Sequence, residues 1–185
     1  EATDRDIEKL CDEALQHGFA SVCVLPIWVK LAFSLLKDRG KVCSVAGFPL
    51  GGNVTRVKAQ EAAQLVQEGA AEVDMVISLG LLKSGMWAEV GRDIEVVVKA
   101  SQPAIVKVIL ETCLLSDEEK RIACRVVLEA GAHFVKTSTG FSKAGATLQD
   151  IALMREIVGP TFGVKASGGI RDRATAQAMI DAGAS

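Results

Sequence analysis

The sequence predicts an α/β fold in which helices alternate with parallel strands, and two observations carry that prediction. A junction from helix end to strand, built around one glycine, recurs at Gly18, Gly69, Gly131 and Gly183. Apolar runs follow these junctions or lie between them, and their starts are about 21 to 32 residues apart. The runs are apolar throughout, as expected of strands buried on both faces of a parallel sheet.

Six strands are expected, near residues 20–25, 41–47, 72–77, 104–110, 133–138 and 161–167. Amphipathic helices should separate them, and one further helix, Thr3 to Gln16, precedes the first strand. Two helix starts are predicted from N-cap threonines, Thr3 and Thr147, and a third from the capping-box pattern Ser116-Asp-Glu-Glu119.

Two architectures fit this alternation, an open doubly wound sheet and a (β/α)8 barrel. The barrel is favoured because no GxGxxG follows the first strand and polar residues end several successive strands. A barrel needs eight strands and about 250 residues, whereas these 185 residues supply what would be strands two to seven. We therefore expect one barrel domain over residues 1–185, truncated at both ends and lacking the first and last strands.

The composition excludes several classes of function. A hydrophobic content of 49%, a charged content of 24% and a net charge of −2 are ordinary for a folded globular protein. No basic run suggests nucleic acid or an anionic membrane, and no apolar stretch is long enough to span a bilayer. The five cysteines show no metal-binding spacing, which favours reduced thiols and a cytoplasmic location, with Cys23 expected in the core. Only two histidines are present, which leaves little material for a His-based metal site or triad and points toward lysine and carboxylate chemistry.

Two lysines on apolar strands are the sharpest functional signal. Lys136 and Lys165 lie one module apart, and desolvating an ammonium group on a buried strand is costly. A small, glycine-containing segment follows each lysine and would let a ligand approach the backbone. A second ammonium nearby favours the neutral, nucleophilic form of an amine. This pattern predicts a Schiff-base site.

Alternation along the strands adds two more residues to that site. Asp74, Lys107, Lys136 and Lys165 would come from four adjacent strands and face one barrel interior. Any one of these lysines alone could be a salt-bridged structural residue, but the set favours a functional site. Glu111, at a strand end, could equally cap a neighbouring loop or touch substrate.

Glycine clusters at two strand ends suggest an anion site. Gly140 ends one strand segment, and Gly168 and Gly169 end the next, with Arg171 and a helix close behind. Backbone N–H groups at such turns and helix starts bind anions, and late barrel loops often bind phosphate. Beside a nucleophilic lysine, this predicts a phosphorylated aldehyde or sugar as substrate.

Five segments, in order along the whole chain, carry a family resemblance. They are Gly47-Phe-Pro-Leu-Gly51, Glu72-Val-Asp-Met-Val-Ile77, Val106-Lys-Val-Ile-Leu-Glu-Thr112, Val135-Lys-Thr-Ser-Thr-Gly140 and Val164-Lys-Ala-Ser-Gly-Gly-Ile-Arg171. Together they resemble the deoxyribose-phosphate aldolase family of class I aldolases. The chain departs from that family at Ser78 and Phe141, and it lacks the family's Asp-x-Thr segment on the first strand and the phosphate loop on the last.

The resemblance implies a TIM barrel lyase that reversibly cleaves 2-deoxy-D-ribose 5-phosphate to acetaldehyde and D-glyceraldehyde 3-phosphate in deoxyribonucleotide catabolism. By position it implies that Lys136 is the Schiff-base lysine and Lys165 the neighbouring cation. Asp74 would transfer protons with a bound water, and Lys107 would be an accessory charge. The phosphate would lie at Gly140, Gly168, Gly169 and Arg171. No cofactor or metal is implied, and we expect a homo-oligomer, either a dimer or a tetramer.

Two alternatives remain open at this point. A different lysine-dependent aldolase or a transaldolase on the same barrel would use another donor than acetaldehyde. An inactive fragment that keeps the motifs would expose two sheet edges, so it should pair, swap or aggregate.

Overall fold

Six parallel strands form a single sheet in the computed structural model, which describes residues 2–185. The strands are β1 (Val22–Val24), β2 (Val42–Ala46), β3 (Ala70–Val76), β4 (Ile105–Ile109), β5 (Phe134–Lys136) and β6 (Gly163–Lys165). Each strand pairs in parallel with the next one along the chain. All six predicted strands are confirmed. Because the order never reverses, the sheet lacks the switch point of a doubly wound fold and follows the barrel pattern.

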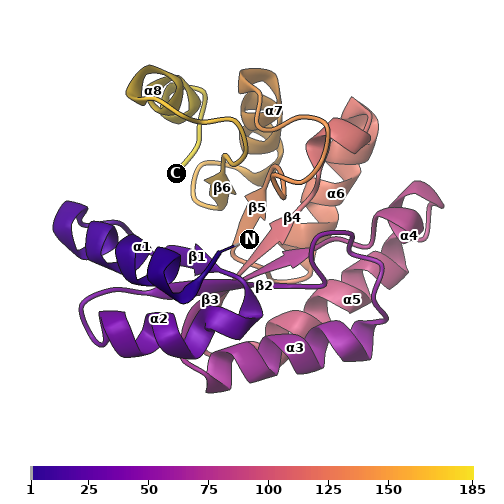
Figure 1. Cartoon of the computed structure of the whole chain (residues 1–185). Helices are drawn as coiled ribbons and strands as arrows, with labels where there is room; N and C mark the ends of the chain where they lie inside the picture. The colour runs from indigo at the N-terminus through magenta and orange to yellow at the C-terminus, as the bar shows by residue number, and fades with distance from the viewer. Residues whose placement is uncertain (1) are drawn as a thin grey trace.

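Helices lie outside the curved sheet (Figure 1). They are α1 (Asp4–His17), α2 (Val29–Leu36), α3 (Thr55–Gln67), α4 (Leu79–Lys83), α5 (Trp87–Ala100), α6 (Asp117–Glu129), α7 (Leu148–Val158) and α8 (Arg173–Asp181). Two short 3-10 helices, η1 (Pro26–Trp28) and η2 (Thr112–Leu114), follow β1 and β4. Within residues 2–185, no helix has the length and apolar character needed to cross a membrane.

The predicted helix caps are confirmed. The Thr3 side chain accepts a hydrogen bond from the Asp6 amide, and the Thr147 side chain accepts one from the Asp150 amide. At the start of α6, Ser116 and Glu119 form the reciprocal bonds of a capping box. The four junction glycines all have positive φ and lie at or just after the end of a helix.

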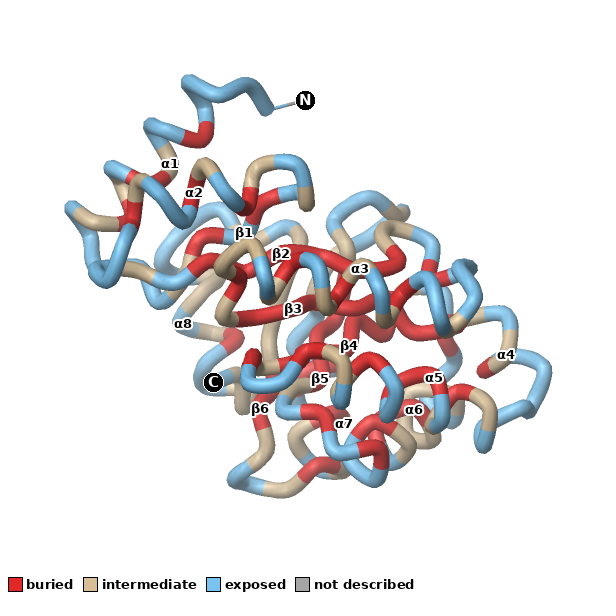
Figure 2. Tube along the Cα trace, turned by 90° about the horizontal axis from the view of Figure 1, so that it is seen from below, coloured by how far each residue is buried: buried red, intermediate tan, exposed pale blue. Residues whose placement is uncertain are grey.

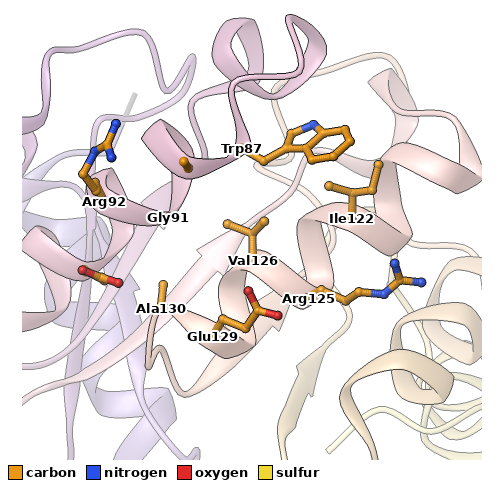
Figure 3. A pocket seen from close by; sticks show the side chains of 10 residues that line it. Trp87, Gly91, Arg92, Ile122, Arg125, Val126, Glu129 and Ala130 are labelled. Carbon is orange, nitrogen blue, oxygen red and sulfur yellow. The ribbon is translucent and has the colours of Figure 1, made fainter.

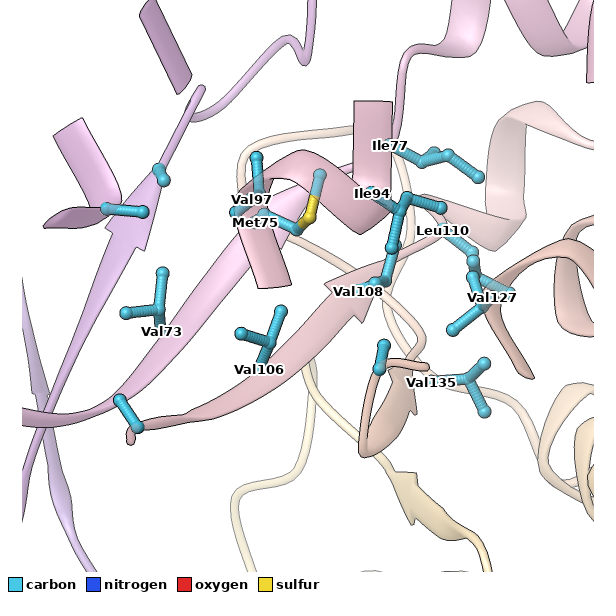
Figure 4. Close-up of a cluster of buried hydrophobic side chains, with 14 of the residues drawn as sticks. Val73, Met75, Ile77, Ile94, Val97, Val106, Val108, Leu110, Val127 and Val135 are labelled. Carbon is cyan, nitrogen blue, oxygen red and sulfur yellow. The ribbon is translucent and has the colours of Figure 1, made fainter. Parts of the chain in front are cut away.

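The outer face of the sheet forms the main hydrophobic core. Val73 and Met75 of β3 and Val106 and Val108 of β4 are fully buried against Ile94 and Val97 of α5 (Figure 4). Figure 2 shows the strands as a mostly buried layer beneath helices whose outer sides are exposed. Because side chains alternate along a strand, the residues between these apolar ones must point to the opposite, inner face.

The two edges of the sheet, β1 and β6, are not paired with each other in the part of the chain that the structure describes. The chain after α8 runs back beside β6, where the Ser185 amide donates to the Val164 carbonyl at 2.9 Å. The Ser185 hydroxyl in turn accepts from the Val164 amide at 3.1 Å. These bonds lie where a next strand would pair with β6. That residues 1–185 are one domain truncated at both ends stays a prediction.

Candidate active site

The register of the sheet brings the predicted site residues onto one face. Asp74 of β3 lies opposite Lys107 of β4, and Lys136 of β5 lies opposite Lys165 of β6. Ile109 of β4 pairs with Lys136, so all four polar residues share the inner face. The outer face keeps the apolar residues between them, which explains why the sequence alternates lysine with valine at these strands.

Asp74 is the centre of the cluster. Its Oδ2 atom is 2.6 Å from Lys136 Nζ, and its Oδ1 atom is 2.8 Å from Lys107 Nζ. The carboxylate is fully buried. Burial raises the pKa of Asp74, but the charges and hydrogen bonds of Lys136 and Lys107 outweigh it, and the pKa lies below its usual range. Asp74 is therefore ionised at neutral pH and links two ammonium groups.

Lys107 is held on three sides. Its Nζ atom is 2.6 Å from Glu72 Oε2, 2.8 Å from Asp74 Oδ1 and 3.4 Å from Cys43 Sγ. Burial lowers the pKa of Lys107, but the surrounding Cys43, Asp74 and Glu72 outweigh burial and raise it above its usual value. Lys107 therefore remains a cation, suited to placing charge rather than to nucleophilic attack.

Lys136 differs from Lys107 in its access to open space. Asp74 accepts its one hydrogen bond among the described residues, and Lys136 lines a cavity of about 230 Å³. Phe48 and Phe141, whose rings meet edge to face at 5.3 Å, form part of the same wall, together with Cys23. An amine with spare donor positions next to a small cavity can reach a bound carbonyl compound.

Lys165 faces a second, more apolar cavity of about 490 Å³ near the open edge of the sheet. Lys107, Phe134, Met179 and Ile170 line it as well. Phe134 lies against Gly163, where an added Cβ would lie 2.2 Å from the ring, so a larger residue at 163 would displace Phe134. The structure thus places the two predicted lysines in register while they line different cavities.

The loops after β4 and β5 are joined through Glu111. Its carboxylate accepts from the Thr139 amide at 3.2 Å and from the Thr139 hydroxyl. Glu111 itself adopts a left-handed backbone with φ of 55° and is almost fully buried. Of the two sequence-based alternatives, the structure supports the loop-capping role.

The loops after β5 and β6 are also joined. The Thr137 hydroxyl donates to the Ser167 carbonyl at 3.0 Å and accepts from the Ser167 amide at 3.0 Å. The Ala146 amide donates to the Gly168 carbonyl at 3.1 Å. Gly145 crosses so close to Gly168 that a Cβ on Gly145 would lie 2.2 Å from the Gly168 oxygen.

The predicted phosphate residues lie within these two loops. Gly140, Gly168 and Gly169 all have positive φ, between 81° and 86°, and Arg171 is exposed. The start of α8 itself is capped by Asp172, whose carboxylate accepts from the Thr175 amide at 2.7 Å. A carboxylate at that end competes with an anion, so the glycine turns are better placed than the helix start.

Sequence reasoning was wrong about Cys23 and missed its neighbour. Cys23 was expected in the core, but it is exposed, because it lies on the inner face of the edge strand β1. Cys43 of β2 is the register partner of Cys23 and is buried. The Cys43 thiol donates a hydrogen bond to Asp74 Oδ1 at 3.2 Å. Glu72 was also given no role, although its position two residues before Asp74 on one strand is a signal for a shared face.

A metal ion is disfavoured at the thiol cluster. Cys23, Cys43 and Asp74 offer three possible ligand atoms within 4.8 Å of one another, and no other group of this kind was found among residues 2–185. The Lys107 ammonium already contacts two of the three residues, so a positive charge is present where a cation would bind.

Lys58 forms a second buried lysine site that sequence reasoning missed. Its Nζ atom is 2.7 Å from Asp93 Oδ2, 2.8 Å from Ser78 Oγ and 3.1 Å from the Val76 carbonyl. The signal was its helical spacing: Lys58, Ala62 and Leu65 form the buried face of α3. This site fastens α3 and α5 to the end of β3.

One further groove lies on the outer surface between α5 and α6 (Figure 3). It measures about 380 Å³, with Gly91, Val126 and Trp87 in its wall and Arg92 and Glu129 among its charged groups. None of the predicted site residues lines it, so it lies apart from the lysine cluster.

Comparisons with known proteins agree with this geometry. The chain matches the DeoC/LacD family aldolase profile over residues 1–185. It is 59% identical to the deoxyribose-phosphate aldolase of Halalkalibacterium halodurans over 98% of this chain and 83% of that protein. The deoxyribose-phosphate aldolase of Brevibacillus brevis is 56% identical over 100% of this chain and 84% of its own length.

Two solved structures show the same fold. A putative deoxyribose-phosphate aldolase from Coccidioides immitis superposes with a TM-score of 0.96 at 40% identity, covering 100% of this chain and 74% of that one. The tetrameric deoxyribose phosphate aldolase from Aeropyrum pernix gives a TM-score of 0.93 at 36% identity, covering 100% and 79%. The fold is a TIM barrel, of which the described residues contribute six strands. By its sequence from end to end and by its fold, the chain belongs to the DeoC/LacD family of aldolases.

Proposed function

We propose that this protein is a class I aldolase that reversibly cleaves 2-deoxy-D-ribose 5-phosphate to acetaldehyde and D-glyceraldehyde 3-phosphate. The observation that carries the proposal is Lys136, an amine at a cavity wall with its Nζ atom 2.6 Å from a buried, ionised aspartate. The identity of the substrate is inferred from the deoxyribose-phosphate aldolases that are more than half identical to this sequence.

The first step forms the Schiff base. Lys136 loses a proton, and its amine attacks the C1 carbonyl carbon of the open-chain sugar to give a carbinolamine. The carbinolamine loses water and becomes an iminium ion. Asp74 lies within hydrogen-bond reach of the amine. Because the pKa of Asp74 is held low, Asp74 passes protons on through a bound water rather than keeping them.

The second step breaks the carbon chain. Removal of the proton from the C3 hydroxyl lets the C2–C3 bond break, and its electrons flow into the iminium to form an enamine. D-Glyceraldehyde 3-phosphate leaves with atoms C3 to C5. The enamine then takes a proton at C2, and water hydrolyses the new iminium to release acetaldehyde and restore the Lys136 amine.

Lys107 and Lys165 act as fixed charges in this scheme. Lys107 holds Asp74 from the side opposite Lys136, so the carboxylate stays aimed at the reacting amine. Lys165 is the register partner of Lys136 on the next strand, so it places a second lysine beside the reacting one on the same face of the sheet.

The substrate phosphate is assigned to Gly140, Gly168, Gly169 and Arg171. Positive φ at the three glycines lets backbone amides converge on an anion without a side chain in the way. The exposed Arg171 side chain can add charge-assisted hydrogen bonds. Neither nucleic acid nor a membrane is needed as a partner.

We also infer a homo-oligomer, a dimer or a tetramer, in the cytoplasm. Support for assembly comes from the Aeropyrum pernix relative, whose structure is described as tetrameric. Support for the compartment comes from five free cysteines, which are typical of proteins kept in reducing surroundings.

Borohydride trapping tests the assignment. The protein is incubated with acetaldehyde and sodium borohydride, and the modified lysine is mapped by mass spectrometry. We expect a reduced ethyl adduct on Lys136. Lys58 is the internal control, because it is also buried beside an aspartate but its three donor positions are all used. An adduct confined to another lysine would overturn the role of Lys136, and a different aldehyde trapped in preference to acetaldehyde would favour another lysine aldolase.

A further inference from the structure

Two thiols face each other beside the reacting lysine. Cys23 of β1 and Cys43 of β2 are register partners on neighbouring parallel strands, and both point to the inner face. Neighbouring strands lie about 4.8 Å apart, within the range of Cα separations that a disulfide bridges. The two sulfur atoms already lie within 4.8 Å of each other. Neither thiol has a role in the chemistry proposed above.

The two thiols differ in access. Cys23 is exposed and lines the same cavity as Lys136, so a small dissolved oxidant can reach it. Cys43 is buried behind it. This is the arrangement of an attacking thiol backed by a resolving thiol.

The surroundings make Cys23 the more reactive of the two. When Cys23 ionises, the Cys43 thiol donates its single proton to the Cys23 thiolate instead of to Asp74, and this hydrogen bond lowers the pKa of Cys23 to about 7, against the opposing effects of desolvation by the surrounding protein and of Asp74. Lys136 and Lys165 act in the same direction as the hydrogen bond. The same pairing, with burial, raises the pKa of Cys43 well above its usual value. A thiolate is therefore available at Cys23 near neutral pH, with a protonated thiol beside it.

We propose that Cys23 and Cys43 form a reversible disulfide when the protein meets a peroxide, and that this bond switches the aldolase site off. The formation of the bond rests on the placement and surroundings of the two thiols. Its effect on catalysis rests on the function proposed above.

The chemistry balances in two steps. The Cys23 thiolate attacks one oxygen of hydrogen peroxide, which breaks the O–O bond and gives a sulfenic acid and, after protonation, water. The Cys43 sulfur then attacks the Cys23 sulfur and gives up its proton to the departing hydroxide, so the S–S bond forms, the S–O bond breaks and a second water leaves. The thiols lose two electrons, which the peroxide accepts, and an added dithiol reverses the change.

Disulfide formation would disturb the catalytic carboxylate directly. In the reduced protein the Cys43 thiol donates to Asp74 Oδ1 and contacts Lys107 Nζ at 3.4 Å. Turning the Cys43 sulfur toward Cys23 removes that donor and leaves Asp74 to re-form its contacts. The linked sulfurs would also stand at the wall of the cavity that Lys136 faces. Both changes reach the amine that forms the Schiff base.

The other three cysteines are poorly suited to this chemistry. Cys11 and Cys124 are buried in the hydrophobic core, and burial raises the pKa of Cys124 to about 12. Cys113 is partly exposed, with its sulfur 3.4 Å from the Ser142 hydroxyl, and it has no thiol partner among the described residues. Cys113 therefore provides the matched control for a single accessible thiol.

The test uses graded hydrogen peroxide, quenching of remaining thiols with an alkylating agent, and peptide mapping without reductant. We expect one cross-linked pair, Cys23 with Cys43, two hydrogen atoms lighter than the separate peptides. Activity should fall by roughly tenfold or more, as expected when reacting groups are displaced, and dithiothreitol should restore it. Each protein is compared with its own untreated activity.

Two variants distinguish a Cys23–Cys43 disulfide from oxidation of a single thiol. Cys113→Ser should oxidise and recover like the unchanged protein. Cys43→Ala should form no internal disulfide, and Cys23 should instead gain oxygen atoms and lose activity without recovery by dithiothreitol at high peroxide. Cys23 and Cys43 both still alkylated after peroxide treatment would overturn the proposal. A Cys23–Cys43 disulfide in a fully active protein would overturn the switch while leaving the aldolase assignment untouched.

Discussion

Two buried lysine–aspartate pairs lie in this molecule, and they differ in what surrounds the amine. Lys58 donates to Asp93, Ser78 and a backbone carbonyl, so its three donor positions are used, and its side chain is 0% exposed. Lys136 donates to Asp74, and its side chain is 9% exposed at a cavity wall. Burial and an aspartate partner are thus common to both, and the unused donor positions beside open space distinguish the reactive one.

The largest expected effect comes from removing the Lys136 amine. Lys136→Ala should reduce kcat by on the order of 10⁴-fold or more, since no covalent intermediate can form. Steady-state assays of the sugar phosphate cleavage, together with the loss of the borohydride adduct, check this. Full activity in a correctly folded Lys136→Ala protein would show that Lys136 is not the reactive lysine, and that a position at a cavity wall does not distinguish it from Lys58.

The second prediction concerns the saturated pair. Lys58→Met should lower the free energy of unfolding by about 3–5 kcal/mol, because Asp93 is left as a buried, unpaired charge. Urea denaturation measures the change. The double variant Lys58→Met/Asp93→Leu removes both charges and should recover much of the loss. An unchanged unfolding midpoint in Lys58→Met would contradict a structural role for this pair.

The third prediction separates the two carboxylates around Lys107. Asp74→Asn should reduce kcat by about 10²–10³-fold, because the group that moves protons near Lys136 is lost. Glu72→Gln is the matched control: Glu72 contacts Lys107 at 2.6 Å but makes no contact with Lys136 among the hydrogen bonds found. It should cost clearly less. A larger loss of kcat in Glu72→Gln than in Asp74→Asn would point to Lys107, rather than Lys136, as the amine that reacts.

The smallest expected effect concerns the ionisation of the Cys23 thiol, which lines the same cavity as Lys136. The pKa of Cys23 is about 7, lowered mainly by its hydrogen bond with Cys43, so the thiolate fraction should rise roughly tenfold between pH 6 and 8 and then level off. Alkylation rates of Cys23 by iodoacetamide across this range report it. Asp74, Lys107, Lys136 and Lys165 are the charged groups around the thiol pair.

Cys43→Ala sharpens that measurement. Without the hydrogen bond, the pKa of Cys23 should move back toward an ordinary thiol, so alkylation should be slower at pH 7 and should still be rising at pH 8. Equal profiles in the two proteins would mean that Cys43 does not set the reactivity of Cys23.

The sequence predicted the strands and the inner-face lysines because both depend on local periodicity. Alternation along β3, β4 and β5 places Asp74, Lys107 and Lys136 on one face whatever the loops do, and cap residues mark helix starts locally. The roles of Lys136, Lys165 and the phosphate residues remain predictions that the experiments above address.

The misses depend on contacts between elements far apart in the sequence. Lys58 and Asp93 lie on different helices, so the sequence around either residue does not predict that they form an ion pair. Cys23 is apolar in context and looks like a core residue, but its exposure is decided by what lies next to β1, which the strand itself does not encode. Alternation gives the face of a residue, and only the packing of the whole sheet gives its solvent access.

The charges gathered on the inner face have a consequence for substrate capture. Lys107, Lys136 and Lys165 face two carboxylates, Glu72 and Asp74, so the interior carries a formal surplus of one positive charge. The protein as a whole carries a net charge of −2. A positive interior with low-dielectric walls, set in a negative molecule, focuses the electrostatic field at its mouth and draws in small anions. Association with a phosphorylated sugar should then slow as ionic strength rises, while the chemical step at the amine does not.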